Sequence, residues 1–407
     1  MGELVFEGSF TQQEPISEDA IAAAERVLRS GRLHRYNVAE GEQSEAALLE
    51  EEFAASVGAK YALAVSSGGY ALATALRALG CRPGDPVLTN AFTLAPVPGA
   101  IASVGATPVL IEITDDLVID IVDMRTKAAA TGARILMLSL MRGHLPDMDA
   151  VMDAAREAGL SVIEDCAHTM GAHWSGTPSG RFGVVGCYST QTYKHINSGE
   201  GGLLVSDDAD VMARATVLSG SYMLYERHSA GPPPEVFETI KLETPNSSGR
   251  MDNLRAAILR PQLAQLDDQR ARWNERYRSL ETALCQSPHI RLRQRPAAET
   301  FVGSSIQMRL PTFTTAQVAD VVAACGRRGV ELKWFGPDEP AAFTSRHVSW
   351  RYMPEQHLPE TDRILATLLD MRIPLTFSKA DCEMIGAIIV DVVAQVADAG
   401  ATQAAAE

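Results

Sequence analysis

The chain has little of what marks several large classes of protein. Its six cysteines are scattered, with no C-x-x-C pair and no metal-ligand spacing, so the sequence predicts neither a disulfide scaffold nor a metal site. The 36 Lys and Arg residues are outnumbered by 51 Asp and Glu residues. The resulting net charge of −15 argues against nucleic-acid binding, which needs clustered positive charge to neutralise phosphates.

Long apolar runs are scarce as well. We find no stretch that reads as a membrane span, and the N-terminal sequence MGELVFEGSF lacks the basic segment and apolar run of a secretory leader. We therefore expect a cytoplasmic protein with reduced thiols and no membrane partner. What is present, 407 residues of which 46% are hydrophobic and 21% charged, is typical of a globular protein with a large buried core.

Apolar runs of strand length alternate with helical patterns between residues 59 and 206. This alternation predicts a mainly parallel sheet covered by helices on both faces, in the larger of two domains. A long helical pattern over 251–284 then leads into a smaller α+β unit. The expected strands are 61–65, 86–88, 107–111, 133–138, 160–163 and 203–205.

Two segments outside this alternation are candidates for contact with a ligand or another chain. Residues 15–30 are expected to form an amphipathic helix, and the loop that follows carries His34 and Tyr36, which are available to bind a substrate. Residues 219–248 are irregular and contain the run Gly-Pro-Pro-Pro. A loop of this length in a compact protein usually contributes to a functional site or to an interface.

One acid and one lysine are the most informative pair of residues. Asp165 follows an apolar run, at the carboxyl end of an expected strand, where open α/β sheets place functional groups. Lys194 lies 29 residues later on a turn before the flexible run Ser-Gly-Glu-Gly-Gly. Pyridoxal 5′-phosphate (PLP) chemistry requires a lysine amine to form a Schiff base and a carboxylate to keep the pyridinium nitrogen protonated. The pair makes the chain a candidate PLP enzyme, although an Asp after a strand can equally be a helix cap and a Lys near glycines a solvated side chain.

A second pattern predicts an anion site. Residues 66–69 read Ser-Ser-Gly-Gly and precede a helical stretch over 70–79. Ser67, Gly68 and Gly69 at a helix start would let backbone N–H groups close on a phosphate without obstruction by side chains. The alternative is a serine N-cap followed by a tight glycine turn.

The order of these motifs resembles a known family. E-D-C-A-H at 164–168, S-x-x-x-x-K at 189–194 and S-G-E-G-G at 198–202 are similar to the signature of the DegT/StrS family of sugar aminotransferases. The resemblance implies an α/β protein of the PLP-dependent aspartate aminotransferase type (fold type I), with a mainly parallel seven-stranded sheet in a large domain and a smaller C-terminal α+β domain. We expect these domains to be residues 1–262 and 263–407. Further segments that agree in order are 58–76, 89–113, 250–263 and 372–375.

The resemblance also implies roles for single residues. Lys194 would bond to the cofactor, Asp165 would pair with the pyridinium nitrogen, and His168 would lie beside the ring. Phe92 matches the position of an aromatic residue that stacks on the ring face. Taken alone, Phe92 could be ordinary core packing and His168 a hydrogen-bonded core histidine.

The phosphate of the cofactor would be shared between two chains. Ser248 stands where the family has an asparagine that reaches the phosphate site of the partner subunit, and Asn246 is a possible substitute. The resemblance therefore implies a homodimer with shared active sites. On this chain, the positions that match phosphate-binding residues are Ser67, Gly68, Gly69 and Ser189.

The resemblance also bears on the reaction. In related sugar dehydratases a histidine replaces the lysine, so Lys194 favours transamination from L-glutamate or L-glutamine to a keto sugar or keto-cyclitol, in an antibiotic or glycan pathway. A PLP-dependent lyase, dehydratase or carbon–nitrogen bond-forming enzyme is the alternative, because a lysine can also serve eliminations, and a non-catalytic binding subunit is a third. Arg142 and Arg250 are candidates for gripping a substrate carboxylate, and each could instead be a structural ion-pair arginine.

Overall fold

The computed structural model describes residues 3–221, 224–342 and 344–404. Its larger unit is built on a seven-stranded sheet in the order β1-β9-β8-β5-β4-β2-β3. Strands β8, β5, β4, β2 and β3 run parallel, and β9 is antiparallel to both of its neighbours, so the sheet is mainly parallel, as expected. The strands are β1 Tyr61–Val65, β2 Pro86–Asn90, β3 Thr107–Ile111, β4 Ile135–Ser139, β5 Ser161–Asp165, β8 Val185–Ser189 and β9 Gly202–Ser206.

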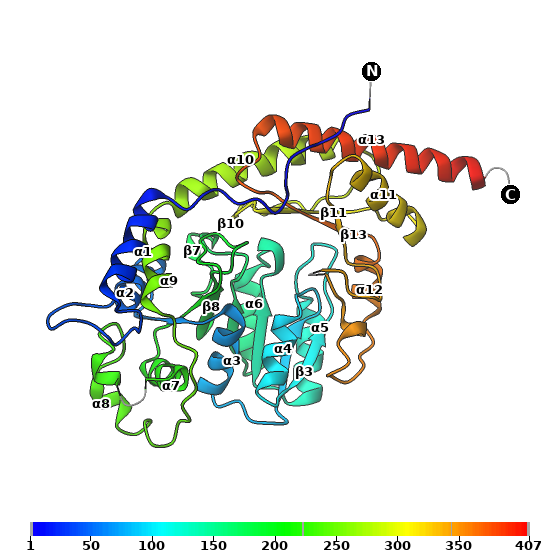
Figure 1. Ribbon diagram of the computed structural model, residues 1–407. Coiled ribbons are helices and arrows are strands. Elements are labelled where there is room, and N and C mark those ends of the chain that lie inside the picture. The colour runs from blue at the N-terminus through cyan, green and yellow to red at the C-terminus, as the bar shows by residue number, and fades with distance from the viewer. Residues whose placement is uncertain (1–2, 222–223, 343, 405–407) are drawn as a thin grey trace.

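Helices cover both faces of this sheet (Figure 1). Side chains of α2, α5, α6 and α9 pack on one face, and side chains of α3, α4 and α7 pack on the other. The strands read as nearly continuous apolar runs because both of their faces are buried. The helices are α2 Glu45–Val57, α3 Gly68–Ala78, α4 Pro96–Ser103, α5 Ile121–Thr131, α6 Met148–Glu157, α7 Ala209–Ser219 and α9 Asn253–Leu263.

Local sequence sets where these helices begin and end. Helix α1 (Glu18–Ser30) starts after Ser17, whose hydroxyl accepts from the N–H of Ala20, and ends at Gly31, which has φ 69°. The helical pattern expected over 251–284 is two helices, α9 and α10 (Leu266–Leu284), and Pro261, which has no N–H to donate, lies in the last turn of α9.

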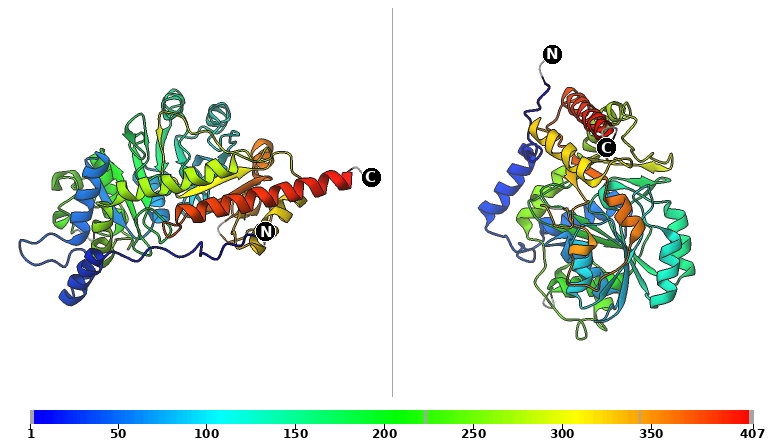
Figure 2. Two further views of the ribbon diagram at one scale, coloured as in Figure 1. Left: turned by 90° about the horizontal axis from the view of Figure 1, so that it is seen from above. Right: turned by 90° about the vertical axis from the view of Figure 1, so that its right-hand side faces the viewer.

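The smaller unit packs helices on a second sheet of order β11-β13-β12 (Figures 1 and 2). Phe6 and Phe10 from the N-terminal segment lie in the core of this unit, against Phe377. Our proposed division into 1–262 and 263–407 therefore has an exception at the start of the chain. The elements are β11 Ser305–Arg309, α11 Thr315–Arg327, β12 Lys333–Trp334, α12 Pro359–Leu365, β13 Leu368–Arg372 and α13 Lys379–Ala404.

Shorter elements connect the two units and fill the loops. The strands β6, β7 and β10 form a second three-stranded sheet. The irregular stretch expected over 219–248 contains only η2 and α8 among its described residues. These elements are β6 His173–Trp174, β7 Thr177–Pro178, β10 Glu299–Thr300, α8 Pro234–Phe237, η1 Met141–Gly143, η2 Tyr225–Arg227 and η3 His347–Ser349.

Helix α13 corrects one sequence-based expectation. An 18-residue window within its residues 379–402 has a mean hydropathy of 1.7, so this helix is long and apolar enough to cross a membrane, whereas we expected no such stretch from the sequence. In the structure this helix packs along α10, and Ile385, Ile389 and Val392 are buried in the core of the smaller unit. Its apolar side chains recur at helical spacing, and Figure 2 shows the two helices side by side.

Candidate active site

A cavity of about 380 Å³ opens where the carboxyl end of the parallel strands meets the smaller unit. This is the position at which open α/β sheets bind ligands. The structure brings eight of the predicted residues together in its wall: Ser67, Gly68, Gly69, Arg142, Asp165, His168, Ser189 and Lys194. The other lining residues had no predicted role and include Leu94, Met141, Gln191, Tyr193, Glu200 and Arg372.

Lys194 lies on the loop between β8 and β9. The Ser198 N–H donates to the carbonyl of Thr190 at 3.0 Å, so the loop folds back on itself and holds Lys194 over the cavity. The Nζ atom lies 2.8 Å from Nε2 of His168. Burial and, to a smaller extent, the nearby Arg142 lower the pKa of Lys194, Asp165 opposes the shift, and the resulting pKa is about 7. At neutral pH a large fraction of this lysine is therefore an uncharged amine.

This pKa predicts how the protein takes up its cofactor. Only the neutral amine attacks a carbonyl, so the rate of PLP capture by the cofactor-free protein should rise with pH and level off above about 7. An ordinary lysine would keep gaining rate up to about pH 10. Stopped-flow absorbance from pH 5.5 to 10 measures the profile. A rate that still climbs steeply at pH 9 would contradict the assignment.

Asp165 is a buried carboxylate at the end of β5. One oxygen accepts from the Ala167 N–H at 3.2 Å, and the other accepts from the Ser139 hydroxyl at 3.2 Å. Burial raises its pKa, although these hydrogen bonds and Lys194 act in the opposite direction. The charged form of Asp165 would therefore be stabilised by a cation bound in the cavity.

His168 is held neutral beside Lys194. Burial lowers its pKa well below the usual value, and the charges of Lys194 and Arg142 lower it further. A neutral imidazole can share a hydrogen with the Lys194 amine at 2.8 Å without adding positive charge. The contact orients the amine toward the cavity that both residues line.

The predicted phosphate site is a tightly packed turn at the start of α3. The Ser67 hydroxyl accepts from the N–H of Tyr70 at 3.1 Å and so caps the helix. A Cβ on Gly68 would lie 2.8 Å from the Cβ of Ser189, and a Cβ on Gly202 would lie 2.5 Å from the carbonyl of Ser67. Glycine at both positions lets β8 and β9 approach the turn. The helix start and Ser189 thus share one wall of the cavity, as an anion site requires.

This packing predicts the effect of a single methyl group. Gly202→Ala should displace the Ser67 turn, because the added Cβ would meet backbone atoms that cannot rotate away. We expect weaker retention of PLP by about tenfold or more, measured as the cofactor dissociation constant. Gly99→Ala in α4 is the matched control, since its Cβ meets nothing within 4 Å. Equal cofactor affinity in the two variants would contradict the predicted anion site.

Phe92 corrects the predicted ring-stacking residue. Its ring is 0% exposed, packs edge-on against Phe335 at 5.3 Å between centroids, and is not among the described residues that line the cavity. The Asn90 side chain donates to the Phe92 carbonyl at 3.1 Å and turns the chain so that this ring enters the core. The aliphatic Leu94 lines the cavity instead.

Arg142 is an ion-pair arginine that also lines the cavity, and its binding of a substrate carboxylate stays a prediction. It lines the cavity, and its guanidinium forms a buried ion pair with Asp370 at 2.7 Å. Its backbone has φ 55°, a left-handed conformation at the tight η1 turn that follows β4. Asp370 is on β13, so this pair ties the smaller unit to the cavity wall.

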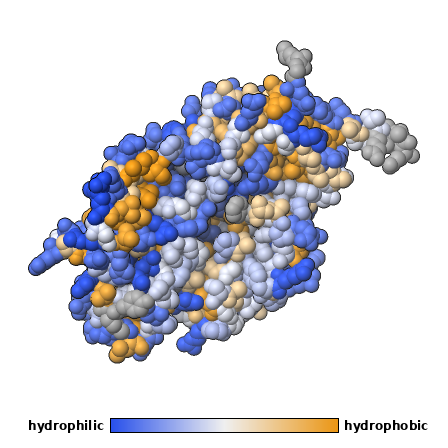
Figure 3. All heavy atoms as spheres, viewed as in Figure 1, coloured by the Kyte–Doolittle hydropathy of each residue, from blue (hydrophilic) through white to orange (hydrophobic). Residues whose placement is uncertain are grey.

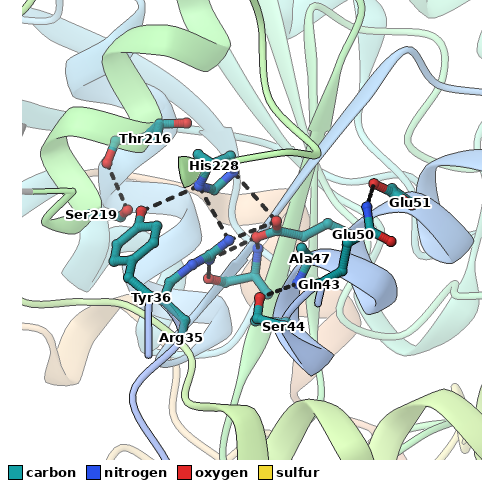
Figure 4. A network of polar contacts seen from close by, with 12 residues as sticks. Arg35, Tyr36, Gln43, Ser44, Ala47, Glu50, Glu51, Thr216, Ser219 and His228 are labelled. Atoms are coloured by element: carbon teal, nitrogen blue, oxygen red, sulfur yellow. Dashed lines mark hydrogen bonds and ion pairs between the residues drawn. The ribbon is translucent and has the colours of Figure 1, made fainter. Parts of the chain in front are cut away.

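The other predicted substrate-binding residues are not among those that line this cavity. Tyr36 is buried, and its hydroxyl lies 3.2 Å from Nδ1 of His228, in a network with Arg35 and Glu50 (Figure 4). Expecting Tyr36 to be available to a ligand was therefore wrong. The Tyr36 hydroxyl, which could have contacted a ligand, is hydrogen-bonded to His228 in this network.

Three predicted residues remain, namely His34 on the loop after α1 and Asn246 and Arg250 in the segment between α7 and α9. His34 is exposed, Arg250 donates to the carbonyl of Gly220, and Asn246 is exposed in the irregular segment before Arg250. The binding of substrate by His34 and Arg250, and of the phosphate in a partner subunit by Asn246, stay predictions.

The network in Figure 4 predicts a large effect on stability. Both oxygens of Glu50 accept from Arg35 at 2.8 Å, and both side chains are fully buried. Glu50→Gln would leave the Arg35 charge buried without a countercharge, and we expect a loss of about 3 kcal/mol in the free energy of unfolding. Glu51→Gln, at an exposed neighbour, should change it by less than about 0.5 kcal/mol. Chemical denaturation measures both, and similar values would contradict the prediction.

Glu164, the neighbour of Asp165 in the motif at 164–168, is a structural carboxylate. Its oxygens accept from the N–H groups of Gly180, Phe182 and Gly183, each at 2.7 Å. The side chain therefore folds the loop before β8 on the opposite side of β5 from the cavity. The sequence position of Glu164 could have predicted this, because neighbouring side chains along a strand point to opposite faces of the sheet.

Comparison with known proteins agrees with this geometry. Residues 14–390 match the DegT/DnrJ/EryC1/StrS aminotransferase family. The chain belongs to this family. Its members use PLP, so the predicted cofactor and the predicted enzyme class are confirmed.

Individual relatives in the family are similar over part of their length. L-glutamine:scyllo-inosose aminotransferase of Streptomyces griseus is 34% identical over 62% of this chain and 59% of its own length. A Micromonospora echinospora protein named as an L-glutamine:3-amino-2,3-dideoxy-scyllo-inosose aminotransferase is 42% identical over 42% of this chain and 40% of its own length. The chain thus matches less than two thirds of these relatives.

A solved structure shows the same fold. The aminotransferase TlmJ from Streptoalloteichus hindustanus superposes with a TM-score of 0.81, covering 96% of this chain and 100% of TlmJ at 22% identity. The predicted fold class is therefore confirmed.

The cavity fits PLP in three respects. A buried lysine amine is available for covalent attachment, a buried carboxylate faces the same space, and a glycine-flanked helix start offers backbone N–H groups to a phosphate. The residues that would hold the cofactor are Ser67, Gly68, Gly69, Asp165, His168, Ser189 and Lys194.

Proposed function

We propose that the protein is a PLP-dependent aminotransferase that moves an amino group from L-glutamate or L-glutamine to a keto sugar or keto-cyclitol, in a biosynthetic pathway for an antibiotic or a glycan. The observation that carries this proposal is the Lys194 amine, 2.8 Å from His168 and in one cavity with Asp165. The names of the relatives, glutamine-dependent scyllo-inosose aminotransferases, support the donor and the acceptor class.

Lys194, His168 and Asp165 would each have a different role in the reaction. PLP supplies an electron sink for the carbon that carries the transferred amino group. Lys194 Nζ can accept and return a proton at neutral pH, because its pKa is about 7. His168 keeps this amine directed into the cavity, and Asp165 would hold a positive charge at the buried end of the site.

The assembly and the location of the protein are part of the same proposal. We propose a cytoplasmic homodimer in which Asn246 and Arg250 approach the cavity of the second chain. Both residues belong to the segment between α7 and α9, outside the cavity of their own chain. Measurement of the molecular mass in solution tests the dimer, and a monomer with full activity would contradict shared sites.

The proposed reaction is tested by absorbance. L-Glutamate and then L-glutamine are added to the PLP-loaded protein, and the cofactor band and the released keto acid are followed. Loss of the band with an equal amount of keto acid supports the first half of a transamination. A band that neither donor changes would contradict the proposed donors and favour a lyase.

A further inference from the structure

A second cavity, of about 310 Å³, also has Lys194 in its wall. The rest of this wall comes from residues 13–17 before α1, from the first turns of α10 with the residues just before them, and from the loop that carries Lys194. The N-terminal segment crosses from the smaller unit to α1 (Figure 1), and the surface between the two units is mostly hydrophilic or intermediate in hydropathy on this side (Figure 3). Of the residues described, Lys194 alone lines both cavities. A molecule bound in the second cavity would therefore lie next to the cofactor lysine.

Two buried polar atoms in the wall of this second cavity have no hydrogen-bond partner in the described part of the chain. They are Nδ1 of His195, a residue that is 4% exposed, and Oε1 of Gln269. The other ring nitrogen of His195 lies 3.1 Å from the Ser304 hydroxyl. Because buried polar groups are nearly always hydrogen-bonded, these two atoms indicate a cavity that takes a polar molecule.

The same wall combines further amides with an apolar side. The indole of Trp273 meets the His195 ring edge-on at 5.2 Å between centroids, and Leu375 lies in the wall beside them. A side-chain amide presents a donor and an acceptor next to each other, which suits neighbouring hydroxyl groups, and an apolar surface suits the C–H face of a ring. The additional amide residues in the wall are Gln13, Asn197 and Gln265.

The charges of the wall do not suit an anion. Arg272 forms an ion pair with Glu14, and Asp268 adds a second negative charge at an exposed position. His195 is neutral, because burial and, to a smaller extent, the charge of Lys194 lower its pKa to about 3. Lys194 itself has a pKa of about 7, so much of it is uncharged at neutral pH. A diphosphate would therefore find no unpaired guanidinium among the described residues of this wall.

We propose that the second cavity binds the acceptor as an uncharged ring with several hydroxyl groups, through His195 and Gln269, and that it does not take a sugar linked to a nucleotide. This inference rests on the proposed function and narrows its acceptor to the cyclitol type. A volume of about 310 Å³ lies at the lower end of the roughly 300–1,000 Å³ of small-molecule sites, which suits a single ring.

Binding is measured first without turnover. myo-Inositol, an uncharged ring of six hydroxyl groups with no carbonyl, is titrated into the PLP-loaded protein by calorimetry, alone and in the presence of UDP. We expect myo-inositol to bind the wild type and UDP not to compete with it. Gln269→Met, which keeps a side chain of similar length, should weaken myo-inositol about fivefold, because one hydrogen bond is lost. Gln286→Met, at an exposed glutamine after α10, is the matched control and should bind as the wild type does.

Both the variant and a second one can be checked for folding. Oε1 of Gln269 has no partner within the described chain, so Gln269→Met should unfold at the wild-type midpoint. His195→Phe keeps the edge-on contact with Trp273 but loses both ring nitrogens, and it should weaken myo-inositol at least as much. No binding by the wild type, affinities within twofold in both folded variants, or displacement of myo-inositol by UDP would each overturn the inference.

Kinetics separates the acceptor from the donor. The protein is first converted to the amine form of its cofactor, and the return of the cofactor band is then followed with scyllo-inosose, an uncharged cyclic ketone with five hydroxyl groups. Gln269→Met should raise the concentration of scyllo-inosose needed for half of the maximal rate about fivefold and leave that of L-glutamate within twofold of the wild type. An equal shift for both substrates would overturn the assignment of this cavity to the acceptor.

This failure is distinguishable from failure of the proposed function. If the wild-type cofactor band does not respond to any amino donor, the proposed reaction is wrong whatever the second cavity binds. If the band responds to the donor and myo-inositol does not bind, only the acceptor cavity is wrong.

Discussion

Lys194→Ala should lower the rate of amino transfer by about 1,000-fold or more. The variant loses both the covalent attachment point of PLP and the group that moves the proton, and general acid–base catalysis alone contributes about 100- to 10,000-fold. Borohydride reduction and peptide mass spectrometry should find the cofactor fixed to Lys194 in the wild type and no fixed cofactor in the variant. Rates are compared with saturating PLP, so that weak binding does not limit the measurement.

The loss should not reflect unfolding. The pKa of Lys194 is about 7 in the folded protein and about 10.4 in an unfolded chain, so burying this amine destabilises the fold below about pH 10, and most strongly below 7. Removing the amine removes that cost, and we expect equal or higher stability at pH 7. Lys60→Ala, at an exposed lysine, is the control. A Lys194→Ala variant with wild-type turnover would overturn the assignment of the whole site.

Asp165→Asn should lower the rate by about 100-fold or more while leaving the covalent link to Lys194 intact. Asparagine has nearly the same shape and can still accept from the N–H of Ala167, but it carries no charge to stabilise a protonated pyridine nitrogen. The cofactor band should persist, and only its response to the donor should slow. Single-turnover absorbance measures both the amount of the cofactor band and the rate at which it responds to the donor.

Stability again distinguishes a chemical role from a structural one. Burial raises the pKa of Asp165 above its unfolded value, so the protonated side chain contributes stability at low pH, and this contribution is lost as the pH rises through the folded pKa. The neutral asparagine should therefore be no less stable at pH 7. Asp153→Asn, at an exposed acid of α6, is the control for both rate and stability. Near-normal turnover in Asp165→Asn would remove this residue from the mechanism.

Most of the larger unit follows from local sequence. The expected strands at 61–65 and 107–111 coincide with β1 and β3, because runs buried on both faces are continuously apolar. The turn at Ser67 and Gly68 was also predictable, since it needs only a serine cap and a residue without a side chain. Helix α2 was not predicted, although Ser44 and Gly58 cap its two ends.

Errors at the site concern where a side chain points. Phe92 lies two residues from Leu94, yet only Leu94 lines the cavity, because the Phe92 ring is buried against Phe335 of the smaller unit. Tyr36 follows a polar loop and reads as a surface residue, but Arg35 and His228 enclose it. Such directions depend on contacts between segments that the sequence keeps far apart.

By themselves, sequence patterns predicted the alternation of strands and helices in the larger unit, the pairing of Asp165 with Lys194, and the family. These depend on residue spacing and on helix caps, which act over a few residues. Only the tertiary structure showed that Arg142 forms an ion pair with Asp370 and that Arg372 of the smaller unit lines the same cavity. The net charge of a cavity depends on which residues line it, and these residues are far apart in the sequence. The packing of the smaller unit against the sheet brings them together, and no local sequence pattern encodes that packing.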